Sequence, residues 1–363
     1  MKNLKIRILL AVLFTTAISW YSGAQVQNSD VYEFPALKQM KILNLRVHIN
    51  LPDLEGFKTL KCDFHMHSVF SDGHVLPDTR VVEAWCDGLD AIALTDHVEN
   101  RKFRDFVNSD LNKSNAMAVQ KGKETGILVV AGAEITRKKP LGHINALFVK
   151  DAEKLRVPAE LDAIDEAVSQ GAYLFWNHPG WPNDTSTLYP VHVKLISQKK
   201  IRGVEVFNGS EMYPKALDWC DELGISYFAN SDLHSVSALS YREKLSRPMT
   251  LVFVKEPSVD GIREALFEGR TLAFFENHLA GKELLLKEFV KKSIVTTVIN
   301  PEKNLIEIRN LTDIPYHIRF GSYIYPVPVP ANQVLRTEMA PGTEVTFTNC
   351  LISQKKQLVM KLW

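Results

Sequence analysis

Residues 62–74 of this 363-residue chain read CDFHMHSVFSDGH and hold a dense group of side chains that bind metals. His65 and His67 are two residues apart, so on an extended strand their imidazole rings point to the same side and can share one ion. Asp72 and His74 follow closely. Imidazole nitrogen suits zinc, iron or manganese. The stretch therefore predicts one part of a metal site.

Similar polar residues recur along the chain at the ends of short apolar runs. From about Leu60 these runs alternate with helical patterns, which predicts a parallel sheet, either a closed barrel or doubly wound. In a closed (β/α) barrel the carboxyl ends of all strands meet on one face, and that face carries the active site. One pocket would then collect the motifs DFHMH, TDH, GAE, NHPG, VFNG and NSDLH.

The motifs FHMHSVFSDG, ALTDH, GAEIT with LGHINAL, NHPG and NSDLH, in this order, resemble those of the PHP (polymerase and histidinol phosphatase) superfamily of metal-dependent phosphoesterases. The resemblance covers about residues 60–270. It implies a distorted (β/α)7 TIM-like barrel that holds two or three divalent ions, which are zinc, manganese or iron. The implied ligands are His65, His67, Glu134 and Asp232 for the first ion, Glu134, His143 and His178 for the second, and Asp72, His97 and His234 for the third.

The third site leaves an alternative open, because SDGH offers both Asp72 and His74. We expect Asp72 to be the ligand and His74 to be an exposed loop residue. Occupancy by two ions also stays open. The two carboxylate oxygens of Glu134 allow it to bridge two cations.

The resemblance implies hydrolysis of a small phosphate ester by attack of a metal-bridging hydroxide at phosphorus. Asp232 or His234 would protonate the leaving oxygen. Asp96 is expected either to orient a neighbouring ligand or to transfer a proton. Arg242 is expected to contact the substrate phosphate. Further residues considered for substrate contact are Arg137, Lys138, Lys139, Lys244, Arg247 and Trp181, whereas Trp176 is expected in the core and Asn177, Asn208 and Asn230 are expected to tie loops together.

The whole chain is similar to a bacterial phosphodiesterase branch of this family, so a phosphodiesterase is expected first. The alternatives are a phosphomonoesterase acting on a nucleotide or sugar phosphate, an amidohydrolase-like C–N or C–O hydrolase, and a non-catalytic binding module. No strand-end motif offers a lysine for carbamylation, which tells against the amidohydrolase. A degenerate binding module predicts missing ligands, whereas every implied ligand position is filled.

Four segments are predicted along the chain. Residues 1–24 combine a basic start, an apolar run and small residues at the end, which is typical of a signal peptide, although an uncleaved anchor stays open. Residues 25–59 form a lead-in segment, and residues 60–280 form the barrel. Residues 281–363 show short strand patterns between turns, which predicts a small β-rich C-terminal domain. The leader predicts a secreted, periplasmic protein.

The net charge of the chain helps to exclude some classes of binding partner. Removal of residues 1–24 leaves 40 basic against 42 acidic residues, a net charge of −2. This near-neutral balance argues against broad electrostatic binding to nucleic acid or anionic membranes. The expected partner is a small phosphate ester, with no nucleic acid and no stable membrane insertion after cleavage of the leader, and no pattern indicates an oligomeric state. The four scattered cysteines are expected to be free, buried thiols rather than disulfides.

Overall fold

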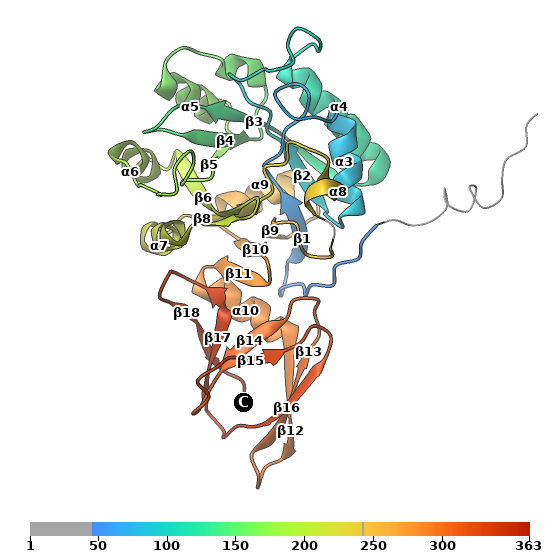
Figure 1. The fold of residues 1–363 in the computed structure, drawn as a ribbon, viewed down its shortest axis with the longest axis vertical. Coiled ribbons are helices and arrows are strands. Elements are labelled where there is room, and N and C mark those ends of the chain that lie inside the picture. Colours follow the sequence, from blue (N-terminus) through green and yellow to red (C-terminus); the bar gives the residue numbers. More distant parts are fainter. Residues whose placement is uncertain (1–45, 242) are drawn as a thin grey trace, which may run out of the picture. The chain divides into compact units, whose positions relative to one another are not determined.

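The structure is a computed structural model that describes residues 46–241 and 243–363 (Figure 1). The predicted signal peptide, the first part of the lead-in segment and Arg242 lie outside the described residues. Within those ranges no helix combines the length and apolar character needed to cross a membrane. The helices are α3 (Pro77–Cys86), α4 (Leu111–Thr125), the 3-10 helix η1 (Ala152–Leu155), α5 (Glu160–Ser169), α6 (Pro190–Ser197), α7 (Pro214–Leu223), α8 (Ser237–Ser240), α9 (Val259–Phe267) and α10 (Glu283–Ser293). The strands are β1 (Lys58–Asp63), β2 (Ala91–Leu94), β3 (Leu128–Thr136), β4 (His143–Leu147), β5 (Tyr173–Trp176), β6 (Ile201–Asn208), β7 (Glu211–Met212), β8 (Ser226–Asn230), β9 (Met249–Val254), β10 (Thr271–Phe275), β11 (His278–Gly281), β12 (Ile294–Asn300), β13 (Leu305–Asn310), β14 (Tyr316–Arg319), β15 (Val327–Val329), β16 (Val334–Glu338), β17 (Glu344–Leu351) and β18 (Gln357–Lys361).

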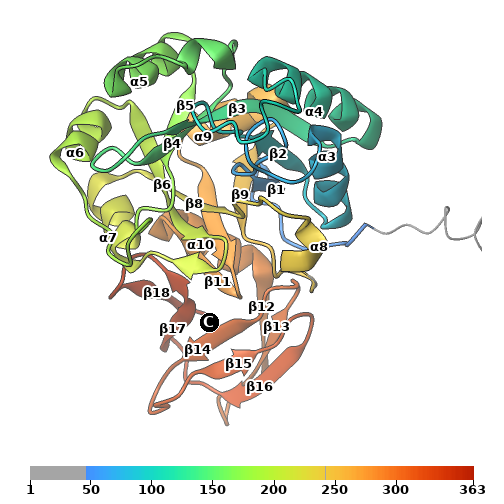
Figure 2. The ribbon, with the colours of Figure 1, turned by 45° about the horizontal axis from the view of Figure 1, so that its top comes forward.

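A single large sheet forms the centre, and its middle strands follow the order β9-β1-β2-β3-β4-β5-β6, with β8 also paired to β6. All residues of β2, β4, β5, β8 and β9 are buried. Helices α3 and α4 lie beside β1 to β3, whereas α5, α6 and α7 lie beside β4 to β8 (Figure 2). Because successive residues of these strands are buried on both faces of the sheet, the strands read as continuous apolar runs.

The strand directions correct the expectation of an all-parallel sheet. β1, β2 and β3 are parallel, as are β5, β6 and β8, but β4 runs antiparallel to both β3 and β5, and β9 runs antiparallel to β1. The loop of residues 137–142 explains the reversal between β3 and β4. It is too short for a parallel crossover, which takes about a dozen residues or more.

The sheet is also not closed, which corrects the expectation of a closed (β/α)7 barrel. β8 pairs with β6 on one side, but no ladder joins it to β9 or β10 among the described strands. Threonine side chains make the contact instead. The Thr250 hydroxyl accepts a hydrogen bond from Ala229 N (3.0 Å) and donates to Ala229 O (2.9 Å), and the Thr271 hydroxyl donates to Tyr227 O (3.1 Å).

The residues after 281 are mostly strands, together with α10, which the sequence analysis missed. β12, β13 and β16 form a separate three-stranded sheet, while β14, β15, β17 and β18 extend the large sheet through a parallel pairing of β11 with β17. One apolar core cluster contains both Phe253 of β9 and Phe347 of β17. The core therefore continues across residue 280, and a domain boundary there stays a prediction.

The four cysteines are free, as expected. Cys62, Cys220 and Cys350 are buried, and Cys86 is half-buried. Burial raises the pKa of all four thiols.

Candidate metal centre

The structure brings all the predicted metal ligands together at one end of the sheet. His65 and His67 follow β1, His97 follows β2, and Glu134 lies in β3. His143 opens β4, and because that strand is antiparallel, its first residue lies at the same end as the last residues of its neighbours. We call the following nine residues the metal-ligand cluster: His65, His67, Asp72, His97, Glu134, His143, His178, Asp232 and His234.

Within the cluster, four groups have potential ligand atoms that all lie within 4.8 Å of one another. Their members are His67, Asp72, His97 and His234; His65, His67 and Glu134; His65, His178 and Asp232; and His97, Glu134 and His143. The first group contains the three residues predicted for a third ion. Glu134 belongs to two groups, as a bridging carboxylate would. Individual ligand assignments stay predictions.

The cluster shows the pattern expected of a site that holds cations. Among the described residues, ten buried side-chain atoms lack a hydrogen-bond partner, and four of these belong to predicted ligands: His65 Nε2, His67 Nδ1, Asp72 Oδ1 and Glu134 Oε2. Buried polar atoms are normally paired. Imidazole nitrogens and carboxylate oxygens are suitable donors for zinc, manganese or iron. The residues present therefore fit divalent ions.

The electrostatics keep the carboxylates ionised. Burial would raise the pKa of Glu134, but the imidazoles of His97, His65 and His143 outweigh it and hold the pKa well below its ordinary value. Burial likewise opposes ionisation of Asp232, whose pKa nevertheless lies well below the ordinary value because of His65 and His67. Both carboxylates are thus anionic acceptors at neutral pH.

The pKa values of the imidazoles in the cluster are shifted in different directions. Burial lowers the pKa of His67 to about 4, with the nearby imidazole of His97 acting in the same direction. Burial also disfavours protonation of His97, yet Glu134 and Asp72 raise its pKa to about 10. His67 is therefore neutral and able to bind a cation through nitrogen, whereas His97 attracts a proton when no metal competes with it.

Glu205 orients the first ligand and was missed by the sequence analysis. It is fully buried in β6, and one of its oxygens lies 2.9 Å from His65 Nδ1 while the other accepts a hydrogen bond from His178 N (2.7 Å). Such a contact fixes the ring so that its other nitrogen faces the cluster. The available signal was an acidic residue inside the apolar strand GVEVFN.

Three asparagines were expected to tie loops together, and in the structure all three donate hydrogen bonds to carboxylates in or beside the metal-ligand cluster. Asn177 donates to Glu134 Oε1 (2.7 Å), and Asn208 donates to Glu205 Oε2 (2.8 Å). Asn230 connects two strands, because it accepts from Phe64 N and donates to Glu205.

Asp96 lies away from the cavity and binds neighbouring serines. Its carboxylate accepts hydrogen bonds from Ser68 N and from the hydroxyls of Ser68, Ser71 and Ser114, at 2.6–2.7 Å. With 2% of its surface exposed and both oxygens satisfied, it holds the 68–71 loop. This location favours the orienting role over proton transfer.

Two ligands have an unfavourable backbone conformation. His178 has φ of 22° and Asp232 has φ of 53°, in a region that residues other than glycine seldom adopt. Asp232 N donates to His65 O (2.8 Å), so the surrounding structure holds this conformation in place. Backbone strain of this kind is concentrated at functional sites.

Gly73 has a steric role in the SDG motif. A Cβ atom there would lie 2.5 Å from the carbonyl of His67. Glycine therefore lets the loop that carries Asp72 approach the His67 backbone. His74, the next residue, is exposed, as expected.

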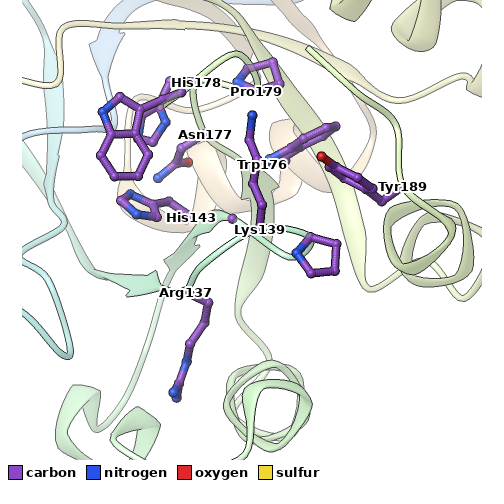
Figure 3. A pocket seen from close by; sticks show the side chains of 11 residues that line it. Arg137, Lys139, His143, Trp176, Asn177, His178, Pro179 and Tyr189 are labelled. Carbon is purple, nitrogen blue, oxygen red and sulfur yellow. The ribbon is translucent and has the colours of Figure 1, made fainter. Parts of the chain in front are cut away.

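Four of the cations considered for substrate binding, which are Arg137, Lys139, Lys244 and Arg247, contact other protein groups. Arg247 is buried and pairs with Asp63 (2.8 Å) and Asp87 (2.7 Å), and Lys244 pairs with Asp313 (2.6 Å). Arg242 lies outside the described residues. In the other loop, Lys138 is exposed, Lys139 donates to Gly180 O (3.1 Å), and Arg137 pairs with Glu99 (3.0 Å). In Figure 3 the Arg137 side chain extends away from His143 and His178.

A second buried charged group supports the ligand segments. Arg80 is fully buried and donates to the carbonyls of His67 (2.8 Å), Leu233 (3.1 Å) and Ser235 (2.7 Å). Asp63 accepts from Ser231 N (3.1 Å) as well as from Arg247. We call Asp63, Arg80 and Arg247 the arginine cluster.

A cavity of about 260 Å³ opens onto the metal-ligand cluster. Its lining residues are Asp72, His97, Asn100, Thr136, His143, His178, Trp181, Glu211, Tyr213, Asp232 and His234. Trp176 is buried and stacks on His192 with 3.7 Å between ring centres, as expected for a core residue. Trp181 is 55% exposed and lies beside the cluster instead.

Comparison with known proteins identifies the family. The PHP domain model matches residues 63–183. A crystal structure from Bacteroides vulgatus, of a two-domain protein containing a predicted PHP-like metal-dependent phosphoesterase, is 36% identical, with 88% of this chain and 99% of that chain covered and a TM-score of 0.83. The chain belongs to the PHP family. The family resemblance drawn from the motifs is thereby confirmed, and the fold is a PHP fold with a mixed, open sheet.

A second relative matches a shorter part of the chain. An uncharacterized protein of Methanocaldococcus jannaschii is 31% identical over 83 residues, which is 22% of this chain and 36% of the relative. The chain thus spans about a third of that protein's length.

Proposed function

We propose that this PHP protein is a metal-dependent phosphoesterase that prefers phosphodiesters. The observation that carries the proposal is the set of four buried ligand atoms that have no hydrogen-bond partner, within a cluster onto which a cavity opens. The likeness to the Bacteroides vulgatus protein supports a phosphoesterase at the general level.

The preference for diesters rests on charge. A phosphodiester carries one negative charge, whereas a monoester carries up to two. Among the described residues that line the cavity there is no lysine or arginine, and Glu211 contributes a carboxylate that lies outside the metal-ligand cluster and is not neutralised by an ion. A less charged substrate therefore meets less repulsion.

Divalent ions held by the cluster would stabilise charge on the phosphoryl oxygens and ionise water at neutral pH. Of the two residues expected to protonate the leaving oxygen, Asp232 is already ionised because of its low pKa. When only two ions are bound and the third site is empty, His234 suits the role better, because its side chain is 37% exposed and lines the cavity. Although burial lowers its basicity, Asp72 and Asp232 raise its pKa above the ordinary value.

The test is metal analysis together with hydrolysis of bis(4-nitrophenyl) phosphate and 4-nitrophenyl phosphate. The purified chain should bind two or more ions of zinc, manganese or iron and hydrolyse the diester faster. Faster turnover of the monoester would replace the diester preference with a phosphomonoesterase. A protein that binds metal but hydrolyses neither ester would reject the proposed function.

We also propose that the chain is exported to the periplasm, which the basic and apolar pattern of residues 1–24 supports. Expression of the full chain in a Gram-negative host, followed by fractionation and N-terminal sequencing, tests this. A mature protein beginning near residue 25 in the periplasmic fraction is expected. An uncleaved chain in the membrane fraction would contradict export as a soluble protein.

A further inference from the structure

The mouth of the cavity has one aromatic wall. The indole of Trp181 is 55% exposed, and its ring centre lies 4.8 Å from that of His143 and 5.9 Å from that of His178. A backbone hydrogen bond from Trp181 N to His178 O (3.0 Å) fixes the turn that presents the indole. An exposed aromatic surface next to the metal-ligand cluster can stack against a ring of the substrate.

Another wall carries a fixed negative charge. Glu211 is exposed in β7, which forms a hairpin with the end of β6 through pairing of Asn208 with Glu211. The hydroxyl of Tyr213 donates a hydrogen bond to the Glu211 carboxylate. Tyr213 is itself 5% exposed, and its backbone N donates to Val206 O (2.9 Å). The carboxylate is therefore held in place at the cavity rather than free to swing away.

The two walls pack against each other. A Cβ atom added to Gly180 would lie 2.9 Å from Cε1 of the Tyr213 ring, so this ring lies directly on the Gly180 backbone. Gly180 immediately precedes Trp181 in the chain. The segment that carries Trp181 and the segment that carries Glu211 thus contact each other through Gly180 and Tyr213, and this contact fixes their relative positions.

The carboxylate of Glu211 and the indole of Trp181 together favour one kind of substrate group. An ionised carboxylate only accepts hydrogen bonds, so Glu211 favours hydroxyl donors and repels a further anionic group. No lysine or arginine lines this cavity in the described part of the chain, so a second phosphate would find no side chain of that kind to pair with there. An indole face packs against the apolar face of a ring.

We infer that Trp181 and Glu211 form a subsite for one ester group of the substrate, and that this group is a neutral ring with vicinal hydroxyls. A hexose and the ribose of a nucleoside both have this chemistry. The inference rests on the proposed phosphodiesterase function, which it deepens by naming the substrate class.

The test uses diesters that all release 4-nitrophenolate, so that the leaving group is constant. The probes are the 4-nitrophenyl diesters of glucose 6-phosphate, of uridine 5′-phosphate and of cyclohexylmethyl phosphate, the last being a ring of similar size without hydroxyls. Bis(4-nitrophenyl) phosphate serves as the reference. The wild-type protein should show a kcat/KM at least about tenfold higher for a hydroxylated probe than for the cyclohexyl probe, since hydrogen bonds to a charged group contribute about 1.5–3 kcal/mol.

Variants distinguish recognition from a structural role. Glu211→Gln should remove most of the preference for hydroxylated rings while lowering KM for bis(4-nitrophenyl) phosphate, because a repulsive charge is gone. Trp181→Ala should raise KM for all ring-bearing probes, and Trp181→Phe should restore part of the loss. Glu222→Gln, at an exposed position in α7, is the matched control and should behave as wild type.

The outcomes separate the two proposals. If bis(4-nitrophenyl) phosphate is not hydrolysed by the metal-loaded wild type, the proposed function fails and the subsite fails with it. If that ester is hydrolysed but wild type does not prefer the hydroxylated probes, or Glu211→Gln keeps the preference, the subsite is rejected and the phosphodiesterase stands. A preference for only the glucose probe or only the uridine probe would show whether the subsite accepts a hexose or the ribose of a nucleoside.

Discussion

Two buried groups of charged side chains lie against the same ligand segments, yet they differ in how their polar atoms are satisfied. In the arginine cluster the guanidinium of Arg247 contacts Asp63 and Asp87, and Arg80 donates to three carbonyls and to Glu83. In the metal-ligand cluster, four buried ligand atoms have no hydrogen-bond partner. Protein atoms alone satisfy the first group, whereas the second contains polar atoms that divalent ions would satisfy.

This difference separates stability from function. A buried charge loses its water, and the loss is compensated only by well-placed partners. The arginine cluster supplies those partners and fixes the segments that carry His65, His67 and Asp232. The metal-ligand cluster leaves its lone pairs for divalent ions, so substitutions in the two clusters should have different consequences.

The largest effect is expected from Glu134→Gln, which replaces the carboxylate shared by two ligand groups. Loss of metal-supplied charge stabilisation, several kcal/mol, should lower diester turnover about a thousandfold or more. Metal content per chain should fall in parallel. Steady-state kinetics and mass spectrometry check this against Glu222→Gln, and a Glu134→Gln protein with wild-type turnover would remove this carboxylate from the account.

Arg247→Met should mainly affect folding. It leaves Asp63 buried without its cation, which is expected to lower the free energy of unfolding by about 3–5 kcal/mol. Lys244→Met is the contrasting variant, because Lys244 is 43% exposed at its side chain and its pair with Asp313 should contribute at most about 1 kcal/mol. Urea denaturation of both, with chelator present, measures the difference, and equal costs would contradict the comparison.

His192 gives a third kind of buried polar group, one that is satisfied in its neutral form. It is fully buried, its Nε2 lies 2.8 Å from Leu141 O, and burial lowers its pKa to about 4. Above pH 6.5 the His192 imidazole is neutral in both the folded and the unfolded chain. Between pH 6.5 and 4 the unfolded chain binds a proton that the folded chain does not, so stability falls as pH falls, by about 3 kcal/mol in total.

Replacement by a residue that does not titrate should remove that part of the pH dependence. We expect the free energy of unfolding of His192→Gln to change less between pH 7 and 4.5 than that of wild type, whatever its absolute value. Urea titrations at the two pH values provide the comparison. Parallel pH profiles for the two proteins would show that His192 titrates normally in the fold.

Glu205→Gln is expected to have the smallest effect, because it weakens the support of His65 without removing a ligand. Loss of such a carboxylate typically costs about 10–100-fold in metal affinity or activity. Metal titration with a competing chelator should show this decrease while the fold, followed by circular dichroism, is retained. Unchanged affinity would mean that the neutral amide orients His65 equally well.

The convergence of the predicted ligands at one end of the sheet could be anticipated because each residue belongs to a short motif at or after a strand end. The alternation of strands and helices was also visible as apolar periodicity. The direction of β4 was not, although the loop of residues 137–142 contained the information in its length. An apolar run of five residues such as HINAL fits a strand of either direction.

The parts that were missed depend on contacts between distant segments. The threonine hydroxyls that take the place of a ladder between β8 and the strands β9 and β10 become visible only when Thr250 lies next to Ala229. Arg247 was considered for substrate contact, but it is buried against Asp63. Single charged residues give no signal of whether tertiary structure pairs them or leaves them in water.

The most direct test of the central claim is the effect of metal on unfolding. Urea denaturation of wild type and Glu134→Gln should be followed with a chelator, and then with zinc, manganese or ferrous ions at about 100 times the dissociation constant. We predict that at least one metal stabilises wild type by about 3 kcal/mol and Glu134→Gln by much less. No stabilisation of wild type by any of the three ions would show that the cluster is not built to hold divalent metals.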